Sequence, residues 1–410
     1  MTEKASPYPV LACVLIVLGT VLGIAGIDLV LPAVPTLHEH LPGSEETAQL
    51  VIASYVAGSG TGLILFGVLG ERFGRRRCLV LALLAYGLLS GLATLSPDML
   101  SLLAVRFVQG LASAAPAVFA PGIIRALFSE QGATRAIGAL SSIESLTPAG
   151  APIAGLWLVQ QGGWKLPFFV TAALAIVLSV VFIAWGGILP PSKDSARGKG
   201  SYWRLMASPV FMRYGLSQAL VVGGLLVFVF GAPAVIVNSM GGTMMHFITM
   251  QVVGISCFII ASNTTGSLVK RFGPEPMISF GTGMAATGAV LVLLFALFGN
   301  GDPIWLAPIF VLVNAGLGFR GPPGFLRAIM AGKGDDDRAS STTILGIFAV
   351  AAGGTALVSP FIDQGLLPLA IAGAGLQLLA VLALLVLPEY SREAEPVQTV
   401  SKKSTKPVSR

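Results

Sequence analysis

Four ionisable side chains lie inside long apolar stretches of this sequence, where charged residues are rare. They are Asp28, Arg106, Glu144 and Arg320, and Arg213 lies near the boundary of a further apolar stretch. Placing an ionisable group inside a membrane costs free energy, so each such residue is by default a candidate functional residue. Proton coupling, gating and recognition of a charged substrate are the kinds of chemistry that these residues could support.

Asp28 is a candidate for carrying a proton. A carboxyl group holds its proton more readily in apolar surroundings and less readily beside a cation. A residue that alternates between these surroundings during a conformational change can therefore move a proton across a membrane. The competing interpretation is a polar cap at the outer end of its helix, because Pro32 follows closely.

Arg106 is a functional candidate because a guanidinium inside a membrane span is costly. Gln109 and Gly110 follow it by about one turn, on neighbouring faces of the predicted helix. The competing interpretation is an arginine side chain that extends to the outer lipid headgroups.

The composition is that of an integral membrane protein. Of the 410 residues, 54% are hydrophobic and 11% are charged, and the mean hydropathy is +0.84. Soluble domains contain about 25% charged residues. The net charge of +6 could suggest a nucleic-acid partner, but the charges lie between apolar stretches and in the tail. We therefore expect contact with the lipid bilayer and no nucleic-acid partner.

Motifs for catalysis or cofactor binding are missing from the sequence. Cys13, Cys78 and Cys257 have no metal-ligand spacing, and His38 with His40 is a weak pattern without convergent ligands. There is no G-x-x-x-x-G-K-S/T phosphate loop and no Ser/His/Asp cluster typical of a nucleophilic enzyme. We expect no enzymatic activity, no cofactor and no metal.

Apolar stretches long enough to span a membrane recur along the chain. A spanning helix needs about 20 apolar residues. The twelve predicted spans are 9–36, 47–70, 78–96, 99–124, 135–158, 166–188, 210–237, 246–269, 276–299, 303–328, 340–362 and 366–388. The predicted organisation is an N-terminal six-helix bundle in 1–188, a linker in 189–208, a C-terminal six-helix bundle in 209–388 and a tail in 389–410. The predicted fold class is an all-α polytopic membrane protein.

Lys and Arg are concentrated in alternate connections between the spans. The odd-numbered connections contain only Lys165, whereas the even-numbered ones contain clusters such as Arg72 and Arg75–Arg77. Segments rich in Lys and Arg stay on the cytoplasmic side. We therefore expect both termini, the linker and the tail to be cytoplasmic.

Two connections share a sequence pattern that indicates an internal duplication. Residues 67–74 and 266–273 both read G-x-L-x-x-R-F-G, which is an offset of 266 − 67 = 199 positions. Many membrane carriers are built from repeated halves. The four-residue spacing predicts that Gly67, Glu71 and Arg75 share one helical face. We interpret these three residues, with Arg72, Gly74 and Arg271, as a conformational latch. The alternative is that the charged residues only keep this connection on the cytoplasmic side of the membrane.

Glu144 and Arg320 lie at comparable predicted depths in opposite halves. Glu144 lies about 13 Å inside its span at 1.5 Å per residue. One hypothesis is an ion pair between the halves that closes the cytoplasmic side. Another is that Arg320 binds an anionic or phenolic substrate group while Glu144 is a second proton site. Unrelated local pairing is the third.

Several stretches together resemble the major facilitator superfamily, and within its drug–proton antiporters the Bcr/CflA group of bicyclomycin and chloramphenicol exporters. They are Ile27–Pro35 (I-D-x-x-L-P-A-x-P), the loop 67–77, Arg106 with Gln109–Gly110, and the Pro/Gly pattern 147–155. The second half adds Ala232–Pro233, Asn263 and Arg271–Gly273. The usual Asp of the loop is Glu71 here, and the resemblance does not supply Glu144 or Arg320.

The resemblance implies two six-helix bundles around a central cavity that opens alternately to each side. It also implies that Asp28 is a coupling or substrate-binding acid and that Arg106 influences its protonation. Tyr55, Gln109 and Phe228 are further candidates for the cavity wall, where apolar surface suits a drug-like molecule.

The resulting prediction is a secondary transporter that exports a small amphipathic or drug-like compound in exchange for protons. The alternative is a proton-coupled carrier for a specific metabolite or organic anion, which Arg320 favours. A receptor or channel is disfavoured by the duplicated loop and by the acidic and basic residues inside the apolar stretches. We expect a monomer in the bacterial inner membrane, with a small molecule and protons as its partners.

Overall fold

The computed structural model describes residues 8–128, 130–185, 202–332 and 336–390, and every regular element in these ranges is helical. The predicted all-α class is therefore confirmed. Most of the predicted linker and tail, 189–201 and 391–410, lies outside the described residues.

Six long helices precede the linker and six follow it. The first six are α1 Pro9–Asp28, α2 Glu45–Phe73, α3 Arg75–Ala93, α4 Met99–Leu127, α5 Glu130–Gly162 and α6 Leu166–Ala184. The others are α8 Pro209–Ala234, α9 Met244–Phe272, α10 Pro274–Phe298, α11 Leu306–Met330, α12 Asp336–Val358 and α13 Leu366–Val386. Five short elements complete the set: η1 Leu31–Glu39, α7 Tyr202–Met206, η2 Val235–Ser239, η3 Pro303–Trp305 and η4 Ser359–Gln364.

Eleven helical segments among the described residues are long and apolar enough to cross a membrane. They correspond to all of the predicted spans except 135–158. That span lies in α5, which has 33 residues and is long enough, but contains polar residues such as Glu144, Gln160 and Gln161. The first predicted span, 9–36, was too long as a single helix, because α1 ends at Asp28 and a 3-10 helix, η1, follows.

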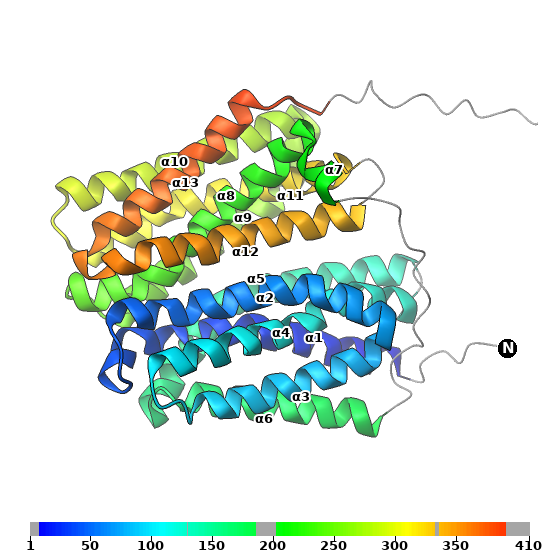
Figure 1. The fold of residues 1–410 in the computed structure, drawn as a ribbon. Helices are drawn as coiled ribbons and strands as arrows, with labels where there is room; N and C mark the ends of the chain where they lie inside the picture. The colour runs from blue at the N-terminus through cyan, green and yellow to red at the C-terminus, as the bar shows by residue number, and fades with distance from the viewer. Residues whose placement is uncertain (1–7, 129, 186–201, 333–335, 391–410) are drawn as a thin grey trace, which may run out of the picture.

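The long helices form two groups that lie side by side (Figure 1). The first group, α1–α6, runs from blue to green, and the second group, α8–α13, runs from green to red. Helix α2 lies against α12, and α5 lies against α9. The two groups therefore meet along these two helix pairs.

The ends of the helices differ in charge and in their contacts. We call the end where α1 begins, where α13 ends and where the connections at Gly74 and Gly273 lie the basic end, and the other the opposite end. Among the described residues, three hydrogen bonds join the groups: Gln49 Nε2 to the Phe230 carbonyl oxygen, Asn238 Nδ2 to that of Pro35 and Ser359 Oγ to that of Glu46. All three lie toward the opposite end, where a shared hydrophobic core also includes Leu31 and Ile236.

Both copies of the duplicated pattern end a helix in the same way. Gly74 follows α2 and Gly273 follows α9, and each has a φ of +87°, which L side chains rarely adopt. The guanidinium carbon of Arg72 lies 5.4 Å from the Phe73 ring centroid, and that of Arg271 lies 5.1 Å from the Phe272 ring centroid. The repeated sequence therefore produces a repeated turn.

One prediction about this loop is wrong. Gly67 and Glu71 share α2, but Arg75 begins α3, because Gly74 ends α2 between them. Four-residue spacing places residues on one face only while the helix continues. The side chain of Glu71 lies outside the described set.

Glycine lets α2 and α4 approach closely within the first group. A Cβ at Gly58 would lie 1.9 Å from the Phe107 carbonyl oxygen, and a Cβ at Gly110 would lie 2.0 Å from that of Tyr55. Small residues are the usual means of close helix packing in lipid, where expulsion of water does not drive association. The hydroxyl of Ser59 also donates to the Gly110 carbonyl oxygen at 3.1 Å.

We expect Gly110→Ala to destabilise the protein. The added methyl group meets backbone rather than a flexible side chain, so α2 and α4 must separate, and overpacking of this kind costs about 1–3 kcal/mol or more. The thermal unfolding midpoint of the purified protein in detergent should fall. Gly91→Ala is the matched control because nothing lies within 4 Å of its Cβ position. Equal midpoints for the two variants would contradict this packing argument.

Candidate functional site

The start of α4 determines the depth of Arg106. Asp98 Oδ1 accepts a hydrogen bond from the Ser101 backbone N–H at 2.8 Å, and Ser101 Oγ accepts one from the Asp98 N–H. The pair is a capping box that begins the helix. The hydrogen bond from the Ser101 N–H holds the pKa of Asp98 below its usual value. Arg106 lies seven residues after the first helical residue, Met99, which places it about 10 Å inside the helix.

Arg106 is fully buried, and its guanidinium donates hydrogen bonds to acceptors on three helices of the first group, α1, α2 and α4. Its Nη2 donates to the Gly26 carbonyl oxygen of α1 at 3.1 Å, its Nε to that of Val51 in α2 at 3.5 Å, and its Nη1 to Gln109 Oε1 at 2.8 Å. The guanidinium carbon lies 4.0 Å from the Tyr55 ring centroid. These contacts rule out the interpretation in which Arg106 extends to lipid headgroups.

The network continues through side chains that the sequence analysis did not single out. Gln109 Nε2 donates to Ser90 Oγ at 2.6 Å. The Tyr55 hydroxyl donates to the Gly23 carbonyl oxygen at 2.7 Å and lies 3.3 Å from the hydroxyl of Tyr86. Ser90 and Tyr86 are four residues apart on α3, so they share one face. That spacing could have been noticed, but nothing in the sequence indicated which neighbours they would meet.

Asp28 is the last residue of α1 and is 5% exposed. Among the described residues its carboxyl group makes no hydrogen bond and no ion pair. Arg106 instead binds the backbone at Gly26, two residues earlier on the same helix. Asp28 is close enough to Tyr55 to interact with it electrostatically. The structure therefore places Asp28 next to the Arg106 network without a salt bridge to it.

Glu144 and Arg320 bind different partners in this conformation. The half-buried side chain of Glu144 on α5 lies near Thr20 of α1, within the first group. Arg320 is fully buried on α11 and donates from Nη1 to the Ser217 carbonyl oxygen of α8 at 2.6 Å. No ion pair joins the two residues in this conformation of the described chain. A pair that forms in another conformation stays a prediction.

Phe228 belongs to the second group and not to the Arg106 network. Its ring stacks on Phe310 with centroids 5.1 Å apart and an interplanar angle of 29°. Thus three of the predicted substrate-binding residues, Tyr55, Arg106 and Gln109, are joined by direct contacts. Phe228 and Arg320 lie in the other group.

The predicted latch has charged surroundings at the basic end. A Cβ at Gly122 of α4 would lie 2.7 Å from Arg75 Nη1, so the Arg75 guanidinium packs against that helix. In the second group, Glu275 lies two residues after Gly273, and its Oε2 lies 3.6 Å from Arg213 Nη2. Glu275 also accepts a hydrogen bond from the Tyr214 hydroxyl at 2.6 Å. The sequence analysis missed this cluster around Glu275.

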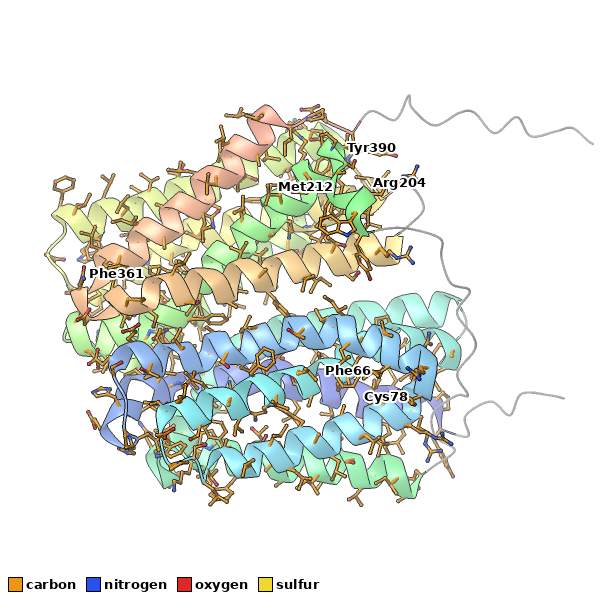
Figure 2. The ribbon with its side chains drawn as sticks, viewed as in Figure 1. Phe66, Cys78, Arg204, Met212, Phe361 and Tyr390 are labelled. Atoms are coloured by element: carbon orange, nitrogen blue, oxygen red, sulfur yellow. The ribbon has the colours of Figure 1, made fainter. Side chains whose placement is uncertain are left out.

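The C-terminal end of α13 joins the same cluster. Arg213 Nη2 lies 3.2 Å from Glu389 Oε1, and the Tyr390 backbone N–H donates to the Tyr214 hydroxyl at 2.9 Å. Figure 2 shows Tyr390 just beyond α13, near the basic end of α8. The segment that follows α13 is thereby tied to α8.

Comparison with known proteins agrees with this architecture. The family model of the Major Facilitator Superfamily matches residues 16–355. The chain is 27% identical over 316 residues to a chloramphenicol resistance protein of Pseudomonas aeruginosa, covering 74% of this chain and 73% of the relative. It is 24% identical over 284 residues to a bicyclomycin resistance protein homolog of Haemophilus influenzae, covering 67% and 71%. A structure of the xylose transporter XylE from E. coli matches with a TM-score of 0.68 at 14% identity, covering 96% of this chain and 100% of that one.

Proposed function

The chain belongs to the major facilitator superfamily, and we propose that it exports small amphipathic or drug-like compounds in exchange for protons by alternating access. Membership of this family makes it a multi-pass membrane transporter of small molecules and not an enzyme. The names of its relatives, a chloramphenicol resistance protein and a bicyclomycin resistance homolog, support a drug exporter. The predicted all-α transporter fold is confirmed by its similarity to XylE.

The observation that carries the proton-coupling proposal is the environment of Asp28. Its carboxyl group is buried at the end of α1 and has no cationic partner among the described residues. A carboxyl group in such surroundings can hold a proton and release it when water or a cation approaches. Arg106, bound to the same helix at Gly26, is the nearby cation that a movement of α1 would bring closer or take away.

Alternating access is supported by where the two groups are joined. The hydrogen bonds made by Gln49, Asn238 and Ser359 lie toward the opposite end, so this conformation is closed there. Export requires a second conformation in which these bonds break. In this proposal residues 1–188 and 209–388 are the two moving units of a monomer, 189–208 links them, and both termini with the tail 389–410 are cytoplasmic.

Inverted membrane vesicles provide the direct test. Vesicles that contain the protein should accumulate a phenicol or a dye when a proton gradient is imposed, and a protonophore should abolish the accumulation. Vesicles from cells without the protein are the control. Rapid flux that does not depend on the gradient would contradict the antiporter and indicate a channel.

A proton-coupled carrier for a specific metabolite or organic anion remains the second candidate. The observation in its favour is the fully buried guanidinium of Arg320. Gradient-driven transport of one anionic metabolite, without transport of the phenicol or the dye, would favour this candidate.

A further inference from the structure

Arg320 differs from the other buried arginine of the second group in its lack of a carboxylate partner. Arg213 is 4% exposed and lies 3.6 Å from Glu275 and 3.2 Å from Glu389. Arg320 is fully buried, yet no acidic side chain pairs with it among the described residues. A buried charge is costly unless it is paired. The missing partner therefore requires an explanation.

The hydrogen bonds of Arg320 leave one edge of its guanidinium unused. A guanidinium has five N–H donors in a planar fork. Nη1 donates to the Ser217 carbonyl oxygen at 2.6 Å and Nη2 donates to Ser217 Oγ at 3.1 Å. Nε is buried and has no hydrogen-bond partner. The edge formed by Nε and Nη2, which can bind the two oxygens of a carboxylate, therefore lacks an acceptor.

A glycine lies beside this edge, on the next turn of the same helix. Gly324 follows Arg320 by about one turn of α11. A Cβ on Gly324 would lie 3.0 Å from Arg320 Nη2 and 3.6 Å from Nε, so a larger residue would crowd the unused edge. The same point lies 3.2 Å from Gln218 Oε1, a second buried polar atom without a hydrogen-bond partner. Two unsatisfied polar groups thus flank one position where the chain has no side chain.

We propose that Arg320, Ser217 and Gln218 form a subsite for the anionic group, a carboxylate or phenolate, of the exported compound. Arg320 binds the two oxygens of a carboxylate, or the single oxygen of a phenolate, through Nε and Nη2. Gln218 Oε1 accepts a hydrogen bond from a donor next to that group. The subsite lies about 15 Å inside the basic end of α11. This inference rests on the proposed transport function and adds the chemical class of its substrate.

The test compares ligands of equal size and different charge on the purified full-length protein in detergent. Benzoate and benzamide are the probes, at a pH where benzoate is fully ionised, with sodium chloride at the same concentration as the reference. Benzoate should raise the thermal unfolding midpoint, whereas benzamide should leave it close to the reference. Equal shifts by benzoate and benzamide would overturn the proposal.

Two variants separate binding from a structural role of Arg320. Arg320→Gln should weaken the apparent affinity for benzoate by about tenfold or more, because hydrogen bonds to a charged group are lost. Arg204→Gln removes the same charge from the exposed helix α7 at the basic end (Figure 2) and should change nothing. An undiminished benzoate effect in Arg320→Gln would overturn the proposal.

Gly324→Ala keeps the charge of Arg320 but places a methyl group beside its Nε and Nη2 atoms. This variant therefore tests the proposed anion-binding edge even if Arg320→Gln does not fold. It should also weaken the benzoate effect, and full retention of that effect would overturn the proposal. The vesicle experiment separates this inference from the proposed function. Proton-driven efflux without selective benzoate binding would contradict the proposed subsite and leave the proposed function standing. Selective benzoate binding without proton-driven efflux would contradict the proposed function and leave the anion subsite standing.

Discussion

Asp28→Asn is expected to abolish proton-driven efflux while the protein continues to reach the membrane. Asparagine has nearly the same shape as aspartate but cannot release a proton, so the change removes the titratable group and little else. The carboxyl group makes no ion pair among the described residues, so its replacement leaves no buried cation unpaired. Accumulation in inverted vesicles with an imposed proton gradient should fall to the level of vesicles without the protein.

A second measurement on the Asp28→Asn variant distinguishes coupling from simple damage. Exchange of labelled for unlabelled substrate, measured without a gradient, requires the conformational change but no net proton movement, so it should persist. Asp302→Asn is the matched control, because Asp302 is exposed and caps a short helix through Oδ1, a role that asparagine also fills. Normal proton-driven efflux by Asp28→Asn would rule out the coupling role of Asp28.

Arg106→Lys is expected to lower efflux by about tenfold or more despite conserving the charge. The planar guanidinium reaches acceptors on α1, α2 and α4 and lies against the Tyr55 ring. A lysine ammonium is a compact donor on a flexible stem and cannot satisfy these directions together. A tenfold change corresponds to about 1.4 kcal/mol, less than the loss of one hydrogen bond to a charged group can cost.

Two readouts separate this role of Arg106 from the requirement for a positive charge alone. Efflux should fall, and the thermal unfolding midpoint should also fall because the acceptors at Gly26 and Val51 lose their donor. Arg204→Lys is the control, since Arg204 lies exposed on α7 (Figure 2). Wild-type efflux by Arg106→Lys would mean that charge is sufficient and that the bonding pattern is not essential.

Most features of the fold could be predicted from the sequence, because they depend on composition along the chain. Segments rich in apolar residues must span the membrane, and their lengths locate most of the helices. The repeated R-F-G ending also predicted equivalent connections, and Gly74 and Gly273 do adopt the same backbone conformation. The predicted span 135–158 is the one whose helix, α5, is not among the eleven apolar segments of the described chain, and polar residues such as Glu144 lower its hydropathy.

The partners of the rare charges could not be predicted, because they depend on how each helix is rotated and how closely it approaches its neighbours. The sequence identified Asp28 and Arg106 as candidates for one site, but only the packing of α1, α2 and α4 directs Arg106 to the backbone at Gly26 and Val51. The same holds for Glu144 and Arg320, whose opposite charges suggested a pair. Glu144 lies near Thr20 of α1 instead, and Arg320 binds Ser217 of α8.

The sequence by itself determined that this chain is a duplicated helical membrane protein with very few interior charges. Hydropathy and residue spacing are local properties of the chain. An apolar segment inside the bilayer must satisfy its own backbone hydrogen bonds, so it forms a spanning helix. Only the tertiary structure decided that Gly74 separates Glu71 from Arg75, that Tyr86 and Ser90 join the Arg106 network, and that Gly324 lies beside the edge of Arg320 whose Nε has no hydrogen-bond partner. These features arise from contacts between helices distant in sequence, or from a single backbone angle, which composition and periodicity do not specify.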